Sequence, residues 1–174
     1  MQKIGLFYGS STGNTASVAR LIRQALLGHG VAQDNVSMFD VATTGAQGLA
    51  GYDALVLGVS TWDIGEIQYD WADAVEDLDG VDLSGKKVAL FGLGDQFSYG
   101  DTFQDAMGIL GAALEERGAQ LVGFTSTAGY DFEASRGVRD GQFIGLSLDE
   151  DNQPELTTGR VQAWVEQITT ALEL

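Results

Sequence analysis

Short apolar runs alternate along this chain with stretches of helical spacing and with glycine-rich turns. The runs Ala54–Val59 and Lys87–Gly92 are almost continuously apolar, which is typical of strands covered on both faces of a parallel sheet. Three further runs have the length and composition of strands: Lys3–Tyr8, Val36–Phe39 and Leu121–Thr125. The pattern therefore predicts five strands.

Helical periodicity separates these strands. The clearest helices are predicted after Asn14, from Thr102 and over Thr158–Leu172, because apolar residues recur there every three or four positions. The pair Arg117-Gly118 ends the second of these helices, and a weaker helical pattern covers Asp70–Leu78. Strands that alternate with helices predict an α/β fold, a doubly wound five-stranded parallel sheet in three layers (α/β/α).

One segment breaks this alternation. Residues 127–141 are polar and rich in glycine, and a strand pattern resumes over Gln142–Leu148. We interpret the segment as an insertion in the fifth strand. Neither an internal repeat nor a second domain is indicated, so residues 1–174 are predicted to form a single domain.

The composition is that of a globular domain and excludes several classes of protein. Hydrophobic residues make up 44% of the chain, but no apolar run approaches the roughly 20 residues of a membrane-spanning helix. The absence of cysteine excludes disulfides, thiolate-held iron–sulfur clusters and cysteine-based zinc sites. No signal peptide is visible at the N-terminus, so a cytoplasmic location is expected.

The chain is strongly acidic. Nine basic and 25 acidic residues give a formal net charge of −16. Such a surface repels nucleic acid and anionic membranes, and it favours protein partners with basic surfaces. Solubility alone is the alternative explanation of this charge.

The segment Gly9–Thr15 (GSSTGNT) joins the first strand to the first helix. A strand that turns through small hydroxyl residues into a helix N-terminus presents backbone N–H groups and the positive end of the helix dipole, an arrangement that suits a phosphate. Asn14 stands where a Walker loop needs lysine, and the glycines lack the spacing of the dinucleotide fingerprint. Phosphate binding is one interpretation, and an ordinary capped turn is the other.

Two later loops are predicted to meet the first one at the same edge of the sheet. The third strand runs into Ser60–Glu66 and the fourth into Leu93–Asp101, and these loops carry the aromatic residues Trp62 and Tyr99. Two aromatic side chains on opposing loops can enclose a flat conjugated ring. For each of them taken singly, a hydrophobic cap on the end of the sheet is the alternative.

The three loops together resemble those of the flavodoxins. Residues 10–15 match that family's [T/S]-x-T-G-x-T pattern, and Thr61–Glu66 and Gly94–Asp101 are similar to its two flavin-ring loops, in the same order along the chain. The insertion and Gly145–Gln153 resemble the extra segment of the long-chain flavodoxins. The resemblance covers essentially the whole chain. It implies a flavodoxin-like fold, noncovalent binding of FMN, and a low-potential one-electron carrier that works between redox proteins, such as a ferredoxin-NADP reductase and an acceptor enzyme.

The resemblance also implies a set of FMN-binding residues. The phosphate would be held by the first loop: Ser10, Ser11, Thr12, Gly13, Asn14 and Thr15. Trp62 would pack on the inner face of the ring and Tyr99 on its outer face. The peptide between Asp63 and Ile64 would face flavin N5, and Gly94 and Asp95 would bond to the pyrimidine edge. Thr102, Phe103 and Asp151 would lie near the ring or the ribityl chain. The other candidate FMN-binding residues are Ser60, Thr61, Gly65 and Leu93.

The ring loops carry acidic residues and no basic one. Asp63, Glu66, Asp95 and Asp101 would oppose the negative charge of fully reduced FMN. One acid about 10 Å away costs an anion roughly 1.7 kcal/mol at an effective dielectric of about 20, before screening by salt. A few such acids shift a one-electron couple by about 100 mV, so the second electron is expected to enter at low potential.

A second group of acids follows the Trp62 loop: Glu66, Asp70, Asp73, Glu76 and Asp77. We expect these residues to surround the exposed edge of the flavin, where a basic redox protein would dock. A solvated helix face is the alternative.

Two other functions fit parts of the sequence. A flavodoxin-fold NAD(P)H-dependent quinone or nitroreductase would use a second nucleotide fingerprint, which the chain does not show. A receiver-type signalling domain needs an acidic cluster after the first strand, where Tyr8-Gly9 stands instead. The sole histidine, His29, is expected to lie far from the three loops. The carrier function therefore predicts no catalytic residue and no metal, and the protein is expected to be a monomer.

Overall fold

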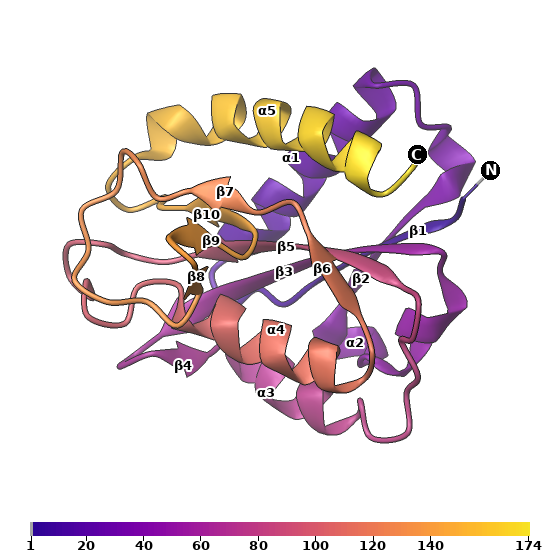
Figure 1. Cartoon of the computed structure of the whole chain (residues 1–174), viewed down its shortest axis with the longest axis horizontal. Helices are drawn as coiled ribbons and strands as arrows, with labels where there is room; N and C mark the ends of the chain where they lie inside the picture. Colours follow the sequence, from indigo (N-terminus) through magenta and orange to yellow (C-terminus); the bar gives the residue numbers. More distant parts are fainter. Residues whose placement is uncertain (1) are drawn as a thin grey trace.

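A parallel sheet runs through the middle of the molecule and helices cover both of its faces (Figure 1). The structure, a computed structural model, describes residues 2–174. The strands lie in the order β2-β1-β3-β5-β10. Their bounds are β1 Ile4–Tyr8, β2 Val36–Asp40, β3 Ala54–Trp62, β5 Lys87–Leu93 and β10 Leu146–Leu148. This order, with β1 between β2 and β3, confirms the doubly wound flavodoxin-like sheet.

The helices form the two outer layers. Helices α1 and α5 cover one face of the sheet, and α2, α3 and α4 cover the other (Figure 1). Their bounds are α1 Asn14–Gly28, α2 Val41–Thr44, α3 Tyr69–Glu76, α4 Asp105–Glu116 and α5 Thr157–Ala171. Short 3-10 turns cover Gln33–Asn35, Gln47–Gly51 and Pro154–Leu156.

Two hydrophobic cores lie between these layers, because successive residues of each strand point to opposite faces. Leu57 of β3 packs in one core with Trp71 of α3 and Leu110 of α4. Its neighbour Val56 packs in the other core with Ile22 of α1 and Trp164 of α5. The apolar runs of the central strands are thus continuous because both faces of those strands are buried.

The fifth strand is split by the insertion. Strand β6 (Gln120–Val122) pairs with the first half of β5, and β10 pairs with the second half, both in parallel. The chain between them forms a separate antiparallel sheet in the order β7-β9-β8 (Figure 1). Its strands are β7 Thr125–Ser126, β8 Val138–Arg139 and β9 Gln142–Phe143. The predicted insertion in the fifth strand is therefore confirmed.

Two details of the predicted strands were wrong. The run Leu121–Thr125 does not form one strand, because the chain turns at Gly123 (φ 80°) and Thr125 joins the small sheet. The run Gln142–Leu148 is interrupted between β9 and β10. Gly145 lies at this break, so close to the Leu90 carbonyl that a Cβ would overlap it.

Helix α4 begins three residues after the predicted Thr102. Gln104 has a left-handed backbone (φ 61°), so the residues before Asp105 are outside the helix. The side chain of Gln104 is buried and donates through Nε2 to Gly92 O, Ser147 Oγ and Leu148 O, at 2.9–3.1 Å. Tertiary hydrogen bonds to β5 and β10 thus hold this residue in a conformation that local pattern does not predict.

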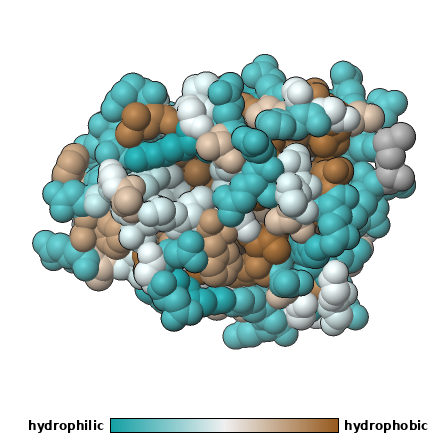
Figure 2. Space-filling view, turned by 45° about the horizontal axis from the view of Figure 1, so that its top comes forward, coloured by the Kyte–Doolittle hydropathy of each residue, from teal (hydrophilic) through white to brown (hydrophobic). Residues whose placement is uncertain are grey.

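The outer surface is largely hydrophilic. On the face in Figure 2, polar residues dominate and hydrophobic residues show as separate patches between them. Among residues 2–174, no helix combines the length and the apolar character needed to cross a bilayer. Both chain ends lie at the same end of the molecule, away from the insertion (Figure 1).

Candidate functional site

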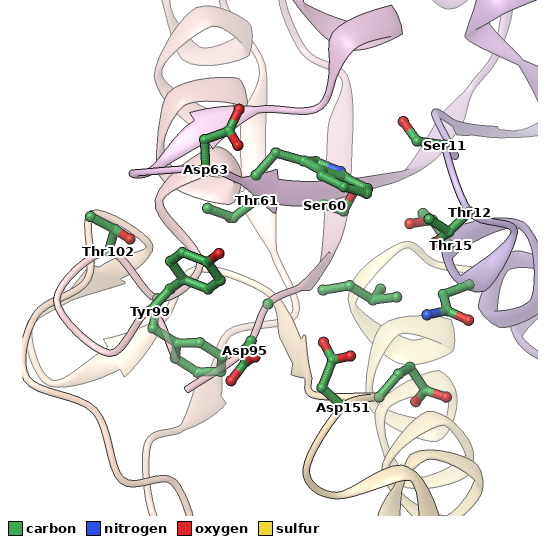
Figure 3. Close-up of a pocket in the computed structure, with 16 residues that line it drawn as sticks. Ser11, Thr12, Thr15, Ser60, Thr61, Asp63, Asp95, Tyr99, Thr102 and Asp151 are labelled. Carbon is green, nitrogen blue, oxygen red and sulfur yellow. The ribbon is translucent and has the colours of Figure 1, made fainter. Parts of the chain in front are cut away.

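A cavity of about 480 Å³ lies where β1, β3 and β5 end. All three loops singled out in the sequence contribute to it, and a fourth, after β10, adds Glu150 and Asp151. Figure 3 shows the labelled side chains around one central space, with Thr12 and Thr15 across from Tyr99 and Thr102. Most of the predicted residues line this cavity: Ser11, Thr12, Asn14, Thr15, Ser60, Thr61, Trp62, Asp63, Leu93, Gly94, Asp95, Tyr99, Thr102, Phe103 and Asp151. Four predicted residues are not in its lining: Ser10, Gly13, Ile64 and Gly65.

The loop between β1 and α1 leads into the N-terminus of the helix beside the cavity. The hydroxyl of Ser10 is used inside the loop, where it accepts hydrogen bonds from Gly13 N (3.1 Å) and Ala16 N (3.3 Å). Ser10 therefore helps to shape the loop. The N–H groups of Asn14 and Thr15 have no partner among the described residues, so a helix N-terminus is left available to an anion.

The Trp62 loop is a tight hairpin between β3 and β4 (Glu66–Ile67). The indole N–H of Trp62 donates to Ser60 Oγ at 2.9 Å, which fixes the ring at the end of its strand. The turn needs left-handed backbone at Asp63 (φ 45°) and Gly65 (φ 79°). Ile64 is missing from the lining because it projects outward, with 80% of its surface exposed.

Gly65 faces α4 rather than the cavity. A Cβ there would lie 2.7 Å from Asp105 Oδ2 and 3.1 Å from Thr102 Cβ. The hairpin thus packs directly on the residues that begin α4. Trp62 (38% exposed) and Tyr99 (47% exposed) both line the cavity and remain accessible from outside.

The Tyr99 loop is organised by Asp95. Its Oδ1 accepts hydrogen bonds from Phe97 N (3.1 Å), Ser98 N (2.8 Å) and Asn152 Nδ2 (2.8 Å). Partial burial would raise the pKa of Asp95, but the bonds from Ser98, Asn152 and Phe97 outweigh it and hold this pKa below its ordinary value. Asp95 is thus held as a carboxylate at the cavity.

Asp149, which the sequence reasoning did not single out, connects two loops of the site. It is fully buried after β10, and it accepts from Gln96 N (3.1 Å), Gln96 Nε2 (2.7 Å) and Asn152 N (3.0 Å). These bonds tie the Tyr99 loop to the loop after β10. The polar run that directly follows the apolar residues of β10 was the available signal in the sequence.

Asp151 lines the cavity, and its pKa is raised above the ordinary value of an aspartate. Partial burial and the negative charges of Asp95 and Asp149 raise its pKa. The hydroxyl Oγ1 of Thr102 is buried and has no hydrogen-bond partner among the described residues. Thr102, one of the lining residues, therefore carries a buried polar atom without a hydrogen bond from the described residues, and the acids nearby disfavour additional negative charge.

The site lacks the groups of a metal centre. Over residues 2–174, no three His, Asp or Glu side chains are placed to hold an ion. His29 follows the last residue of α1, at the helix end opposite the cavity. A 15-residue helix is about 22 Å long, so the histidine is remote from the three loops.

Fold and site together define a doubly wound α/β protein with a cavity at the switch point of its sheet, where the ligands of such sheets bind. The flavodoxin family model matches residues 6–164, and the chain belongs to the flavodoxin family. It is 50% identical to a flavodoxin of Picosynechococcus over 174 residues, the full length of both chains. It is 49% identical to a flavodoxin of Synechocystis over 173 residues, 99% of each chain.

A solved structure gives the same result. The fold matches the flavodoxin of Fusobacterium nucleatum, whose crystal structure is described as bound to flavin mononucleotide, with a TM-score of 0.90 at 34% identity. The match covers 98% of this chain and 99% of the other.

Proposed function

We propose that the cavity binds FMN noncovalently and that the protein carries single electrons between redox proteins. Flavodoxins are electron carriers rather than enzymes, and the close relatives of this chain are flavodoxins. One observation carries the assignment of the site: a loop with backbone N–H groups that are unpaired within residues 2–174, and two aromatic rings from separate loops, line the same cavity. Its place beside β1 and β3 follows the rule for ligands of doubly wound sheets, of which flavodoxin is itself an example.

The residues present fit FMN. The cavity of about 480 Å³ is within the usual range for small-ligand sites. The N–H groups of Asn14 and Thr15 suit the phosphate at one end. At the other end, the unpartnered Thr102 hydroxyl suits the polar atoms of the ring or ribityl chain.

Each part of the site has one task. The helix N-terminus, with the hydroxyls of Thr12 and Thr15, binds the phosphate without any lysine or arginine. Trp62 and Tyr99, which line the cavity, would hold the ring and exclude water from it. FMN, when bound, supplies the redox chemistry, which proceeds one electron at a time. The carboxylates of Asp95 and Asp151 make a second negative charge on the ring unfavourable.

Reconstitution of the apoprotein with FMN tests this assignment. We expect the apoprotein to bind FMN with quenching of flavin fluorescence. The double variant Trp62→Ala with Tyr99→Ala should bind it at least about 10-fold more weakly, given roughly 0.5–1.5 kcal/mol per aromatic contact beyond area burial. Tyr69→Ala is the matched control, because Tyr69 is an aromatic residue with 77% of its surface exposed and is absent from the cavity lining. Undiminished affinity in the double variant would overturn the assignment.

The partner is proposed to be a redox protein with a basic surface. Three exposed apolar side chains lie on the loops around the cavity mouth and at the start of α3: Ile64, Tyr69 and Phe97. Exposed acids accompany them, including Glu66 and Asp73. An apolar centre surrounded by charges of one sign suits docking of a complementary surface. We propose a cytoplasmic monomer that meets such partners in turn.

Salt dependence tests the docking proposal. The rate of electron transfer from a basic flavin reductase should fall as ionic strength rises from 0.01 to about 0.15 M, because the Debye length shortens from about 30 to about 8 Å. Glu66→Gln with Asp73→Asn should flatten this dependence. Asp34→Asn with Glu173→Gln is the matched control, because Asp34 precedes β2 and Glu173 bonds to Lys87 at the start of β5, at the end of the sheet opposite the three loops. The docking proposal fails if both pairs of substitutions have the same effect.

A further inference from the structure

Gln68 packs against the loop between β1 and α1, which includes Gly9 and Ser11. It joins β4 to α3, and its side chain is fully buried. Its backbone N–H donates to Ser60 O at 3.0 Å, so the residue also touches the strand that carries Trp62. Gly9, the first residue of the loop, has no side chain at the point where a Cβ would overlap Gln68 Oε1. The loop and this buried amide therefore fit against each other.

The hydrogen bonds of Gln68 fix the direction of its amide. Trp71 N donates to Oε1 at 3.2 Å, and a backbone N–H can only donate. On the other side, Nε2 is 2.7 Å from Asp70 Oδ2, and a carboxylate can only accept. The oxygen and nitrogen of this amide are thus assigned by partners that allow no exchange.

The second hydrogen of Nε2 points to the loop. It is donated to Ser11 Oγ at 3.1 Å. A serine hydroxyl has one hydrogen and two lone pairs, and one lone pair of Ser11 is occupied by this bond. The hydrogen of Ser11 is therefore directed away from Gln68. Ser11 lines the cavity on the same side as Thr12 and Thr15 (Figure 3).

We propose that Gln68 is a positioning residue that makes the Ser11 hydroxyl an obligatory hydrogen-bond donor to the phosphate of FMN. The inference rests on the proposed function, because it assumes that FMN is the ligand of this cavity. A phosphate offers acceptors to the loop, so a hydroxyl held as a donor favours it. Asp70 acts through Gln68 by fixing the amide. The arrangement favours FMN over riboflavin, which has the same ring but no phosphate.

An exchange of the two side-chain groups tests the proposal with total charge retained. In the variant Gln68→Glu with Asp70→Asn, the buried carboxylate still accepts from Trp71 N and now also accepts from the new amide at position 70. It has no hydrogen to donate to Ser11, whose hydroxyl turns inward to donate to it. We expect FMN affinity to fall by about 10- to 100-fold, the effect of losing one hydrogen bond to a charged group. Riboflavin affinity should be unchanged.

The Ser11→Ala background separates positioning from every other effect of the exchange. Without the hydroxyl, the exchange should reduce FMN affinity much less than it does when Ser11 is present, because its effect passes through that hydroxyl. The control is Gln162→Glu with Asp34→Asn, the same exchange at two exposed positions outside the cavity lining, which should leave both affinities unchanged. If the exchange variant does not fold, Gln68→Met, which lacks the donor, allows the same comparison.

The possible results have distinct meanings. An equal loss of FMN affinity with and without Ser11, or an equal loss for FMN and riboflavin, would overturn the positioning role while leaving FMN binding intact. A wild-type apoprotein that binds no FMN would instead overturn the proposed function. A loss that is specific to FMN and dependent on Ser11 supports the inference.

Discussion

Replacing Thr102 by valine should stabilise the apoprotein and weaken FMN binding, two effects of opposite sign from one substitution. Thr102 lies between the two ring loops: its N–H donates to Tyr99 O at 3.2 Å, and Gly65 of the Trp62 hairpin packs on its side chain. Its Oγ1 is buried without a hydrogen-bond partner among the described residues. Valine has nearly the same shape and lacks the hydroxyl.

The magnitudes follow from the cost of an unpaired buried group. Such a group costs about 1–3 kcal/mol, so its removal should stabilise the apoprotein by at least about 1 kcal/mol. In a domain of this size, about 1 kcal/mol corresponds to a rise of about 2–4 °C in Tm. The FMN complex loses one hydrogen bond of about 1 kcal/mol. FMN binding therefore becomes about 2 kcal/mol less favourable, which raises the Kd about 30-fold.

Thermal unfolding of the apoprotein and fluorescence titration with FMN measure the two effects. Thr102→Ser keeps the hydroxyl and is the control, with FMN affinity close to that of the wild type. The reasoning is refuted if Thr102→Val lowers the Tm of the apoprotein and leaves the Kd for FMN unchanged. That outcome would mean that the hydroxyl is satisfied by solvent and does not contact the ligand.

Three further predictions concern the same region. Partial burial and the charges of Asp95 and Asp149 raise the pKa of Asp151, so the ionised side chain destabilises the folded apoprotein, and the lost stability is recovered as the pH falls through the raised pKa. Asp151→Asn should therefore raise the Tm of the apoprotein slightly at pH 7, and the difference from the wild type should shrink in acid. A difference in Tm that does not depend on pH would contradict this. Asp95→Asn should raise the reduction potential for the second electron by tens of millivolts, and by at most about 70 mV for an acid about 10 Å from the ring. If potentiometry shows the same potentials in the variant and the wild type, the charge of Asp95 does not lower this potential. Gly9→Ala should lower the free energy of unfolding by about 1–3 kcal/mol and impair FMN binding, because the added Cβ would overlap Gln68. If chemical denaturation shows no loss of stability in this variant, the close approach of Gly9 to Gln68 is excluded.

Much of the fold could be predicted from the sequence because its pattern is local. The central strands β3 and β5 are buried on both faces, and their continuous apolar runs predict this burial. The glycine after Arg117 has φ 92°, as expected of a residue that ends a helix. The split of the fifth strand was also visible, since a polar, glycine-rich segment interrupts its pattern.

The site was predicted less completely. The loops that carry Trp62 and Tyr99 were found because large aromatic residues in turns are unusual, and both residues line the cavity. That the Ser10 hydroxyl also accepts hydrogen bonds within its own loop was not visible in the sequence, and its contact with a phosphate stays a prediction. Asp149 was not singled out, because a buried acid whose partners come from another loop has no local signature.

The amino-acid sequence by itself determined the alternating strands and helices, the place of the insertion and three of the four loops that line the cavity, because each depends on spacing between near neighbours. Only the tertiary structure decided which polar groups point at the ligand. Gln68 and Ser11 are 57 positions apart, and Gln96 and Asp149 are 53 apart, yet each pair is hydrogen-bonded. The direction of a hydroxyl or an amide depends on such distant partners, so it is fixed only when the sheet brings its loops together.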